Sequence, residues 1–210
     1  MIGDWGALLT LLNFGGVAVF AASGALAAAR RKHDIVTFVF FGAVTGVGGG
    51  SLRDLLIGAP VFWVGQPEYI VVCVAAALVI WLIGGGPGRE RALLWLDALG
   101  LSAYAVVGAM KAQAFGVPPL PSVVMGILTA SFGGIIRDVL AGEPSVLLRR
   151  ELYITAALAG AAGFVGCRSL GLEPAASELI GFALAFGVRA GAIRFDWRLP
   201  GFPGRAAAPD

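Results

Sequence analysis

Long apolar stretches alternate with short polar breaks along this chain. About 20 helical residues are needed to cross a hydrocarbon core about 30 Å thick, and the apolar stretches reach or approach that length. They predict seven membrane helices, at residues 5–29, 35–57, 69–84, 92–115, 122–141, 152–167 and 179–193. Charges, prolines and glycines fill the breaks, none of which is long enough for a soluble domain. We therefore expect an all-α polytopic membrane protein with a single membrane domain over residues 1–210.

The composition supports this fold class. Hydrophobic residues make up 58% of the chain and charged residues 13%, against roughly 45–50% and 25% in soluble domains. The mean hydropathy is +0.87. These values exclude a soluble globular protein and an intrinsically disordered one.

Basic residues concentrate on one side of the predicted topology. The loops after the first, third and fifth predicted helices and the C-terminal tail hold eleven of them, namely Arg30, Arg31, Lys32, Arg89, Arg91, Arg149, Arg150, Arg189, Arg194, Arg198 and Arg205. The opposite side has only Arg168. Because cytosolic loops are enriched in Lys and Arg, we expect the C-terminus in the cytosol and, with seven spans, the N-terminus outside.

The chain matches itself without gaps when it is shifted by 84 residues. Among the identical positions, the shift places Gly49-Gly50 on Gly133-Gly134 and Arg53-Asp54 on Arg137-Asp138. It predicts one repeat at 5–84, a second at 92–167, a seventh helix at 177–195 and a cytosolic tail at 196–210. Each repeat has an odd number of helices, so the second copy is inverted about an axis in the membrane plane. Inverted repeats are typical of transporters and some channels.

A glycine motif recurs within the second and fifth predicted helices. It comprises Gly48, Gly49 and Gly50 in one copy and Gly133 and Gly134 in the other, with the polar residues Thr45, Thr129 and Ser131 and the aromatic Phe132 nearby. Glycine costs about 1 kcal/mol relative to alanine inside a helix, so these positions predict a kink or an unwound segment that lines a conduit. The alternative is that the glycines only allow close packing between helices.

An Arg-Asp pair follows each glycine motif. Charged residues inside a span usually face a cavity or one another, so Arg53-Asp54 and Arg137-Asp138 are candidate pore residues. Local structural salt bridges are the alternative. Arg53 lies near the predicted outer boundary and Arg137 near the inner one, so we expect the two pairs at opposite mouths.

Lys111 breaks the internal symmetry, because the equivalent position in the first repeat is Ala27. It either snorkels to the membrane surface or faces the conduit and responds to the membrane field, worth about 2.3 kcal/mol per charge per 100 mV. Asp97 matches Asn13, and we expect both to form hydrogen bonds within the bundle.

No catalytic triad, metal-ligand spacing or phosphate loop is present, so we expect neither an enzyme nor a nucleic-acid-binding protein.

The doubled glycine and Arg-Asp motif, within three plus three plus one helices, resembles the bacterial and archaeal TRIC (trimeric intracellular cation) channels. The resemblance covers residues 15–200. It implies a homotrimer in the cell inner (plasma) membrane, with a potassium-conducting pore in each protomer and gates at the glycine motifs. In animal members a lysine on the fourth helix is linked to voltage sensing and phosphoinositide binding, and Lys111 matches it without the basic residues that follow there. Phe132 is a candidate hydrophobic constriction.

Two other functions fit the same features. The prokaryotic sequence family is also described as containing glycine transporters, and an inverted repeat with broken helices suits a transporter equally well. A purely structural oligomer would instead have all four charges of the Arg-Asp pairs self-paired and no water-filled cavity. We expect no cofactor or metal. The expected partners are other copies of this chain, permeant potassium, with sodium as a second ion, and membrane lipids that bind the basic loops.

Overall fold

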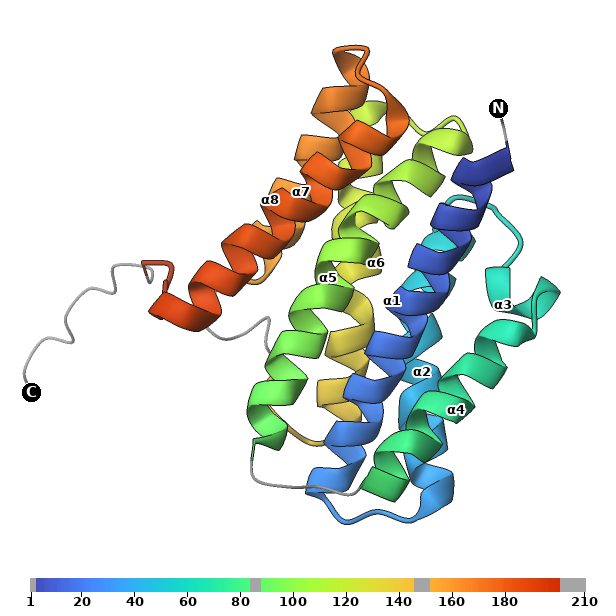
Figure 1. Cartoon of the computed structure of the whole chain (residues 1–210), viewed down its shortest axis with the longest axis vertical. Coiled ribbons are helices and arrows are strands. Elements are labelled where there is room, and N and C mark those ends of the chain that lie inside the picture. The colour runs from blue at the N-terminus through green and yellow to red at the C-terminus, as the bar shows by residue number, and fades with distance from the viewer. Residues whose placement is uncertain (1–2, 84–87, 146–151, 201–210) are drawn as a thin grey trace, which may run out of the picture.

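The computed structural model describes residues 3–83, 88–145 and 152–200, which form a bundle of long helices (Figure 1). Eight helices lie in these residues: α1 (Gly3–Arg30), α2 (Ile35–Leu56), α3 (Phe62–Gly65), α4 (Glu68–Ile83), α5 (Arg89–Ala114), α6 (Pro119–Leu140), α7 (Ile154–Ser169) and α8 (Pro174–Phe195). All except α3 correspond to the seven predicted helices. The predicted all-α fold class is therefore confirmed.

Four of the described helices are long and apolar enough to cross a membrane, namely α2, α5 over Arg91–Ala114, α6 and α8. The apolar helices α4 and α7 are shorter, at 16 residues each. Hydropathy located the helix centres but not every end. Helix α8 begins five residues before the predicted residue 179, because Glu173 caps the backbone N–H of Ala176 and Pro174 fits the first turn.

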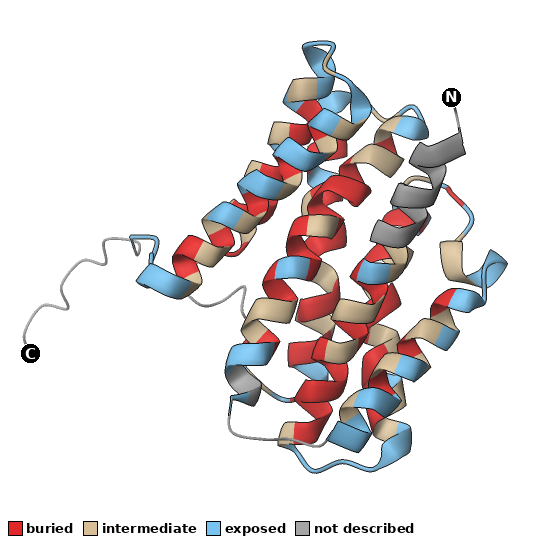
Figure 2. Cartoon of the chain, viewed as in Figure 1, coloured by how far each residue is buried: buried red, intermediate tan, exposed pale blue. Residues whose placement is uncertain are grey.

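The two predicted repeats pack against each other through their first two helices. Helix α1 lies against α5 and α2 against α6, while α4 and α7 lie outside these pairs and α8 covers α5 and α7. Buried residues concentrate on the central helices, whereas α4 and α8 expose their outer faces (Figure 2).

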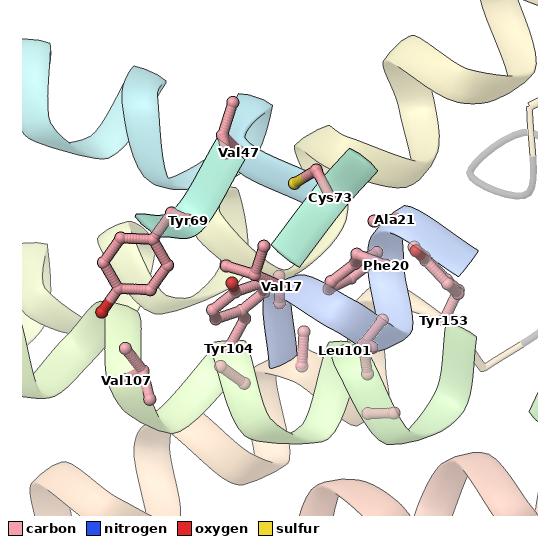
Figure 3. Close-up of a cluster of buried hydrophobic side chains, with 14 residues drawn as sticks. Val17, Phe20, Ala21, Val47, Tyr69, Cys73, Leu101, Tyr104, Val107 and Tyr153 are labelled. Atoms are coloured by element: carbon pink, nitrogen blue, oxygen red, sulfur yellow. The ribbon is translucent and has the colours of Figure 1, made fainter. Parts of the chain in front are cut away.

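An aromatic pair marks the middle of the bundle. Phe20 of α1 and Tyr104 of α5, which are equivalent in the 84-residue shift, stack with ring centroids 5.3 Å apart and planes at 9° (Figure 3). Gly16 packs against the ring of Tyr104, and its equivalent Gly100 packs against the ring of Phe20. The contact is therefore reciprocal, as a pseudo-two-fold axis requires.

The position of Arg189 in the structure changes the predicted count of basic residues on the cytosolic side. We assigned it to the basic cytosolic tail, but it lies inside α8, fully buried, with its guanidinium 5.1 Å from the centre of the Tyr153 ring. The prediction was wrong because Arg189 falls within the predicted seventh helix and not after it, and its face of α8 packs on the second repeat. Three other counted residues, Arg149, Arg150 and Arg205, lie outside the described residues.

Candidate functional site

The glycine motifs lie where α2 and α6 come closest. Both helices continue through the motifs, so the unwound segment predicted there is absent from α2 and α6 in this structure. A Cβ atom placed on Gly49 would lie 2.2 Å from the carbonyl oxygen of Thr129, and one on Gly133 would lie 2.5 Å from that of Thr45. The two helices thus cross backbone to backbone, in the close packing that the sequence left as the alternative.

The other motif glycines make room for side chains. Gly50 faces the ring of Phe62 from α3, Gly134 faces the hydroxyl of Tyr153, and Gly48 faces the Cδ1 atom of Ile136. Only at Gly48 would an added methyl group meet the flexible end of an aliphatic side chain, at 3.0 Å.

The polar residues beside the glycines differ between the two copies. Thr129 donates its hydroxyl to the Met125 carbonyl at 2.6 Å, and Ser131 donates to Ile127 at 2.7 Å. The hydroxyl of Thr45 is buried and has no hydrogen-bond partner among the described residues. Phe132 is half-buried on α6 and does not line the cavity described below.

Asp54, at the end of α2, is the centre of one charge cluster. Its carboxylate accepts a hydrogen bond from Arg53 Nε at 2.9 Å and from the backbone N–H of Phe62 at 3.0 Å. Lys111 reaches it from the end of α5, with Nζ 2.8 Å from Oδ1. The short helix α3, which the sequence did not predict, therefore helps to hold the carboxylate, and Lys111 contacts Asp54 in place of snorkelling away.

A cavity of about 580 Å³ adjoins this cluster. Its lining is contributed by α1, α2, α4, α5 and the segment around α3, and includes Asn13, Arg53, Phe62, Tyr69, Tyr104 and Lys111. The Lys111 side chain is 24% exposed, whereas that of Arg53 is 4% exposed and that of Asp54 is fully buried. Lys111 is therefore the most accessible charge of the cluster.

Arg137, at the end of α6, is the centre of the second charge cluster. Its Nε donates to Asp138 at 2.9 Å, and its Nη1 donates to Asp97 of α5 at 2.7 Å and to Ser23 of α1 at 3.2 Å. The Arg137 side chain is 1% exposed and that of Asp97 is 2% exposed. The second cluster is thus enclosed by protein.

The two clusters lie at opposite ends of the bundle, because α2 and α6 run in opposite directions (Figure 1). In each cluster the arginine pairs with the aspartate that follows it in sequence. Asp97 was predicted to bond within the bundle, but its partnership with Arg137 was not predicted. An acidic residue inside a predicted span was the signal that could have identified it. Within the described ranges, no group of His, Cys, Asp or Glu could hold a metal ion.

Comparison with known proteins places this arrangement in a family. A family model described as "Glycine transporter" matches the chain twice, at residues 10–84 and 94–169. The inner membrane protein YadS of Escherichia coli is 38% identical over 203 residues, which cover 93% of this chain and 96% of that protein.

Solved structures agree with these matches. A TRIC trimeric intracellular cation channel orthologue from Rhodobacter sphaeroides has a TM-score of 0.88 at 47% identity, covering 90% of this chain and 99% of that one. A structure described in a study of conductance through TRIC cation channels has a TM-score of 0.83 at 29% identity, covering 99% of this chain and 100% of that one. These structural relatives are channels, not enzymes. The chain therefore matches the family model described as "Glycine transporter" and, by its likeness to solved relatives, is a membrane protein of the prokaryotic TRIC family.

Proposed function

We propose that this chain is a cation channel that conducts monovalent ions, chiefly potassium and also sodium, through a pore inside each protomer of a homotrimer. The observation that carries the proposal is the cavity of about 580 Å³ beside Lys111, which enters the bundle between the two predicted repeats. The solved TRIC relatives support the same function. We further propose the inner membrane as its location, with the N-terminus outside and the C-terminus cytosolic, from the bias of basic residues.

The gate in this proposal is the crossing of α2 and α6. The backbones meet at Gly49 and Gly133, and Phe20 stacks on Tyr104, which lines the cavity. In this proposal these two contacts close the path that continues from the cavity. Bending at the glycines would part the two helices. The unpartnered hydroxyl of Thr45 lies at the same crossing and could then contact water or an ion.

Selectivity in this proposal depends on Asp54. Two cations, Arg53 and Lys111, line the cavity and would repel a permeant cation, while the Asp54 carboxylate contacts both of them. Lys111 is also placed to respond to the membrane field, because it is the cluster's most accessible charge and is held by a single carboxylate.

Single-channel recording in a planar bilayer under a potassium chloride gradient tests the proposal. The wild type should show discrete openings with a cation-selective reversal potential. Lys111→Ala should change the conductance or the voltage dependence, and Asp54→Asn should shift the reversal potential towards chloride. Arg168→Ala is the matched control, because Arg168 is an exposed cation that donates a hydrogen bond to the Leu172 carbonyl and does not line the cavity. Lys111→Ala currents identical to those of the wild type would remove Lys111 from the pore.

A transporter for a small solute such as glycine is the second candidate. One observation favours it: a cavity adjoins the cluster at the end of α2, while the cluster at the end of α6 is enclosed, as access from one side requires. A silent bilayer together with saturable uptake of labelled glycine into vesicles would replace the channel by this transporter.

A further inference from the structure

A second cavity, of about 510 Å³, lies between the beginning of α5 and the end of α8. The described residues that line it are Arg91, Trp95, Ile193 and Arg194. The two helices diverge toward this end of α8 (Figure 1), and the rings of Trp95 and Phe186 make a contact between them with centroids 6.2 Å apart. The cavity is therefore a wedge between diverging helices, away from the pore proposed above.

Both charged residues in the described lining of this wedge are arginines. Arg91 and Arg194 are both exposed, and neither has an ion-pair partner in the part of the chain that the structure describes. Helix α5 begins after Gly88 with no side-chain cap, so its first backbone N–H groups add a partial positive charge at the same end. Two guanidinium groups and an uncapped helix start together favour an anion, above all a phosphate group.

The surroundings point to a membrane lipid as the source of that phosphate. Phe195, Trp197 and Leu199 follow Arg194 and are 66%, 47% and 46% exposed. Tryptophan beside basic residues is typical of the headgroup level of a bilayer, and basic hollows between membrane helices bind anionic headgroups. The loop that carries Arg30, Arg31 and Lys32 lies at the same end of the bundle (Figure 1).

We propose that this wedge binds the phosphate of an anionic phospholipid, whose acyl chains lie against the exposed apolar residues after Arg194. Arg91 and Arg194 hold the headgroup from two helices, so the lipid links α8, which lies outside the predicted repeats, to α5.

The test is a thermal-unfolding titration of the purified full chain in neutral detergent. Phosphatidylglycerol should raise the unfolding temperature more than phosphatidylcholine does. Arg91→Gln and Arg194→Gln should each weaken the apparent affinity about fivefold, the effect expected of one basic residue at an anionic lipid surface, and the double variant should bind near background. Arg198→Gln is the matched control, because Arg198 is exposed and pairs with Asp196 in the tail.

Three results would overturn the proposal. Equal stabilisation by phosphatidylcholine would show that the lipid does not need a net negative charge to bind. Equal stabilisation by inorganic phosphate would show that the site binds free phosphate and does not need a phospholipid. Arginine variants that bind like Arg198→Gln would place the lipid elsewhere. Unfolding temperatures without lipid check that the variants fold, and native mass spectrometry should detect one retained phosphatidylglycerol per protomer in the wild type and not in the double variant.

Discussion

The two Arg-Asp clusters contain the same dipeptide in nearly opposite surroundings. At the end of α2, the third charged residue is Lys111, so two cations share one carboxylate beside a cavity. At the end of α6, the third is Asp97, so two carboxylates share Arg137 inside closed protein. The cluster beside the cavity is accessible through Lys111, and the cluster around Arg137 is sealed. The two copies of the motif therefore lie in similar helices, and single differences in α5, at Asp97 and Lys111, give the two clusters different ion-pair partners and different exposure.

The largest expected effect comes from removing the arginine of each cluster. Arg137→Met would leave Asp97 and Asp138 without their arginine in a closed site. Removing one partner of a buried ion pair lowers the free energy of unfolding by about 3–5 kcal/mol. In Arg53→Met, Asp54 would still be held by Lys111 and by the Phe62 N–H, so we expect a loss of about 1–2 kcal/mol. The measurement is thermal unfolding of the purified protein in detergent.

Equal losses from the two methionine variants would contradict the contrast between the clusters. The double variant Arg137→Met with Asp97→Leu is the control, because removing one stranded carboxylate should restore part of the stability lost by Arg137→Met alone.

The next effect concerns the glycine crossing, where the two copies should behave alike. Gly49→Ala and Gly133→Ala would each press a methyl group into a carbonyl oxygen of the facing helix, and such overpacking costs about 1–3 kcal/mol. Gly48→Ala is the control, since its methyl group meets only the tip of Ile136 and alanine favours a helix by about 1 kcal/mol. Unfolding temperatures and single-channel open times should separate Gly48→Ala from the other two. A tolerated Gly133→Ala would mean that the crossing is looser than described.

The sequence predicted the helices because hydropathy reports burial in lipid or protein along one element at a time. It also placed the Arg-Asp pairs at opposite ends, since the direction of each helix follows from counting spans. It could not pair Lys111 with Asp54, 57 residues away, because that contact depends on how far α5 leans toward the end of α2. Arg189 was misplaced for a similar reason, since only the packing of α8 on α7 shows that its side chain is covered.

A smaller effect should distinguish the equivalent threonines. Thr129→Val removes a hydroxyl that bonds Met125 and should cost about 1 kcal/mol. Thr45→Val removes a buried hydroxyl with no partner in the described residues, so stability should stay the same or rise. If ions pass the crossing, only Thr45→Val should lower the single-channel current. A current loss confined to Thr129→Val would mean that the hydroxyl of Thr129, and not that of Thr45, contacts the ion.

The smallest effect concerns the starts of α2 and α6. Asp34 accepts a hydrogen bond from the Thr37 N–H at 2.9 Å, which lowers the pKa of its carboxyl, whereas α6 starts at Pro119 with no side-chain cap. The stabilisation from Asp34 is therefore present above the unfolded-state pKa and is lost as the pH falls through the lower folded-state pKa. Hydrogen exchange should show the first turn of α2, but not that of α6, opening at acid pH. Asp34→Ser, a cap that does not titrate, should remove this difference.

The stacking of Phe20 on Tyr104 has an evolutionary consequence. These rings occupy equivalent positions, so the contact joins a side chain to its own counterpart, as at the axis of an isologous dimer. Two separate three-helix units could meet in this way only if one inserted upside down relative to the other. Fusion of the two units in a single chain fixes both orientations during synthesis, and each half is then free to acquire its own substitutions.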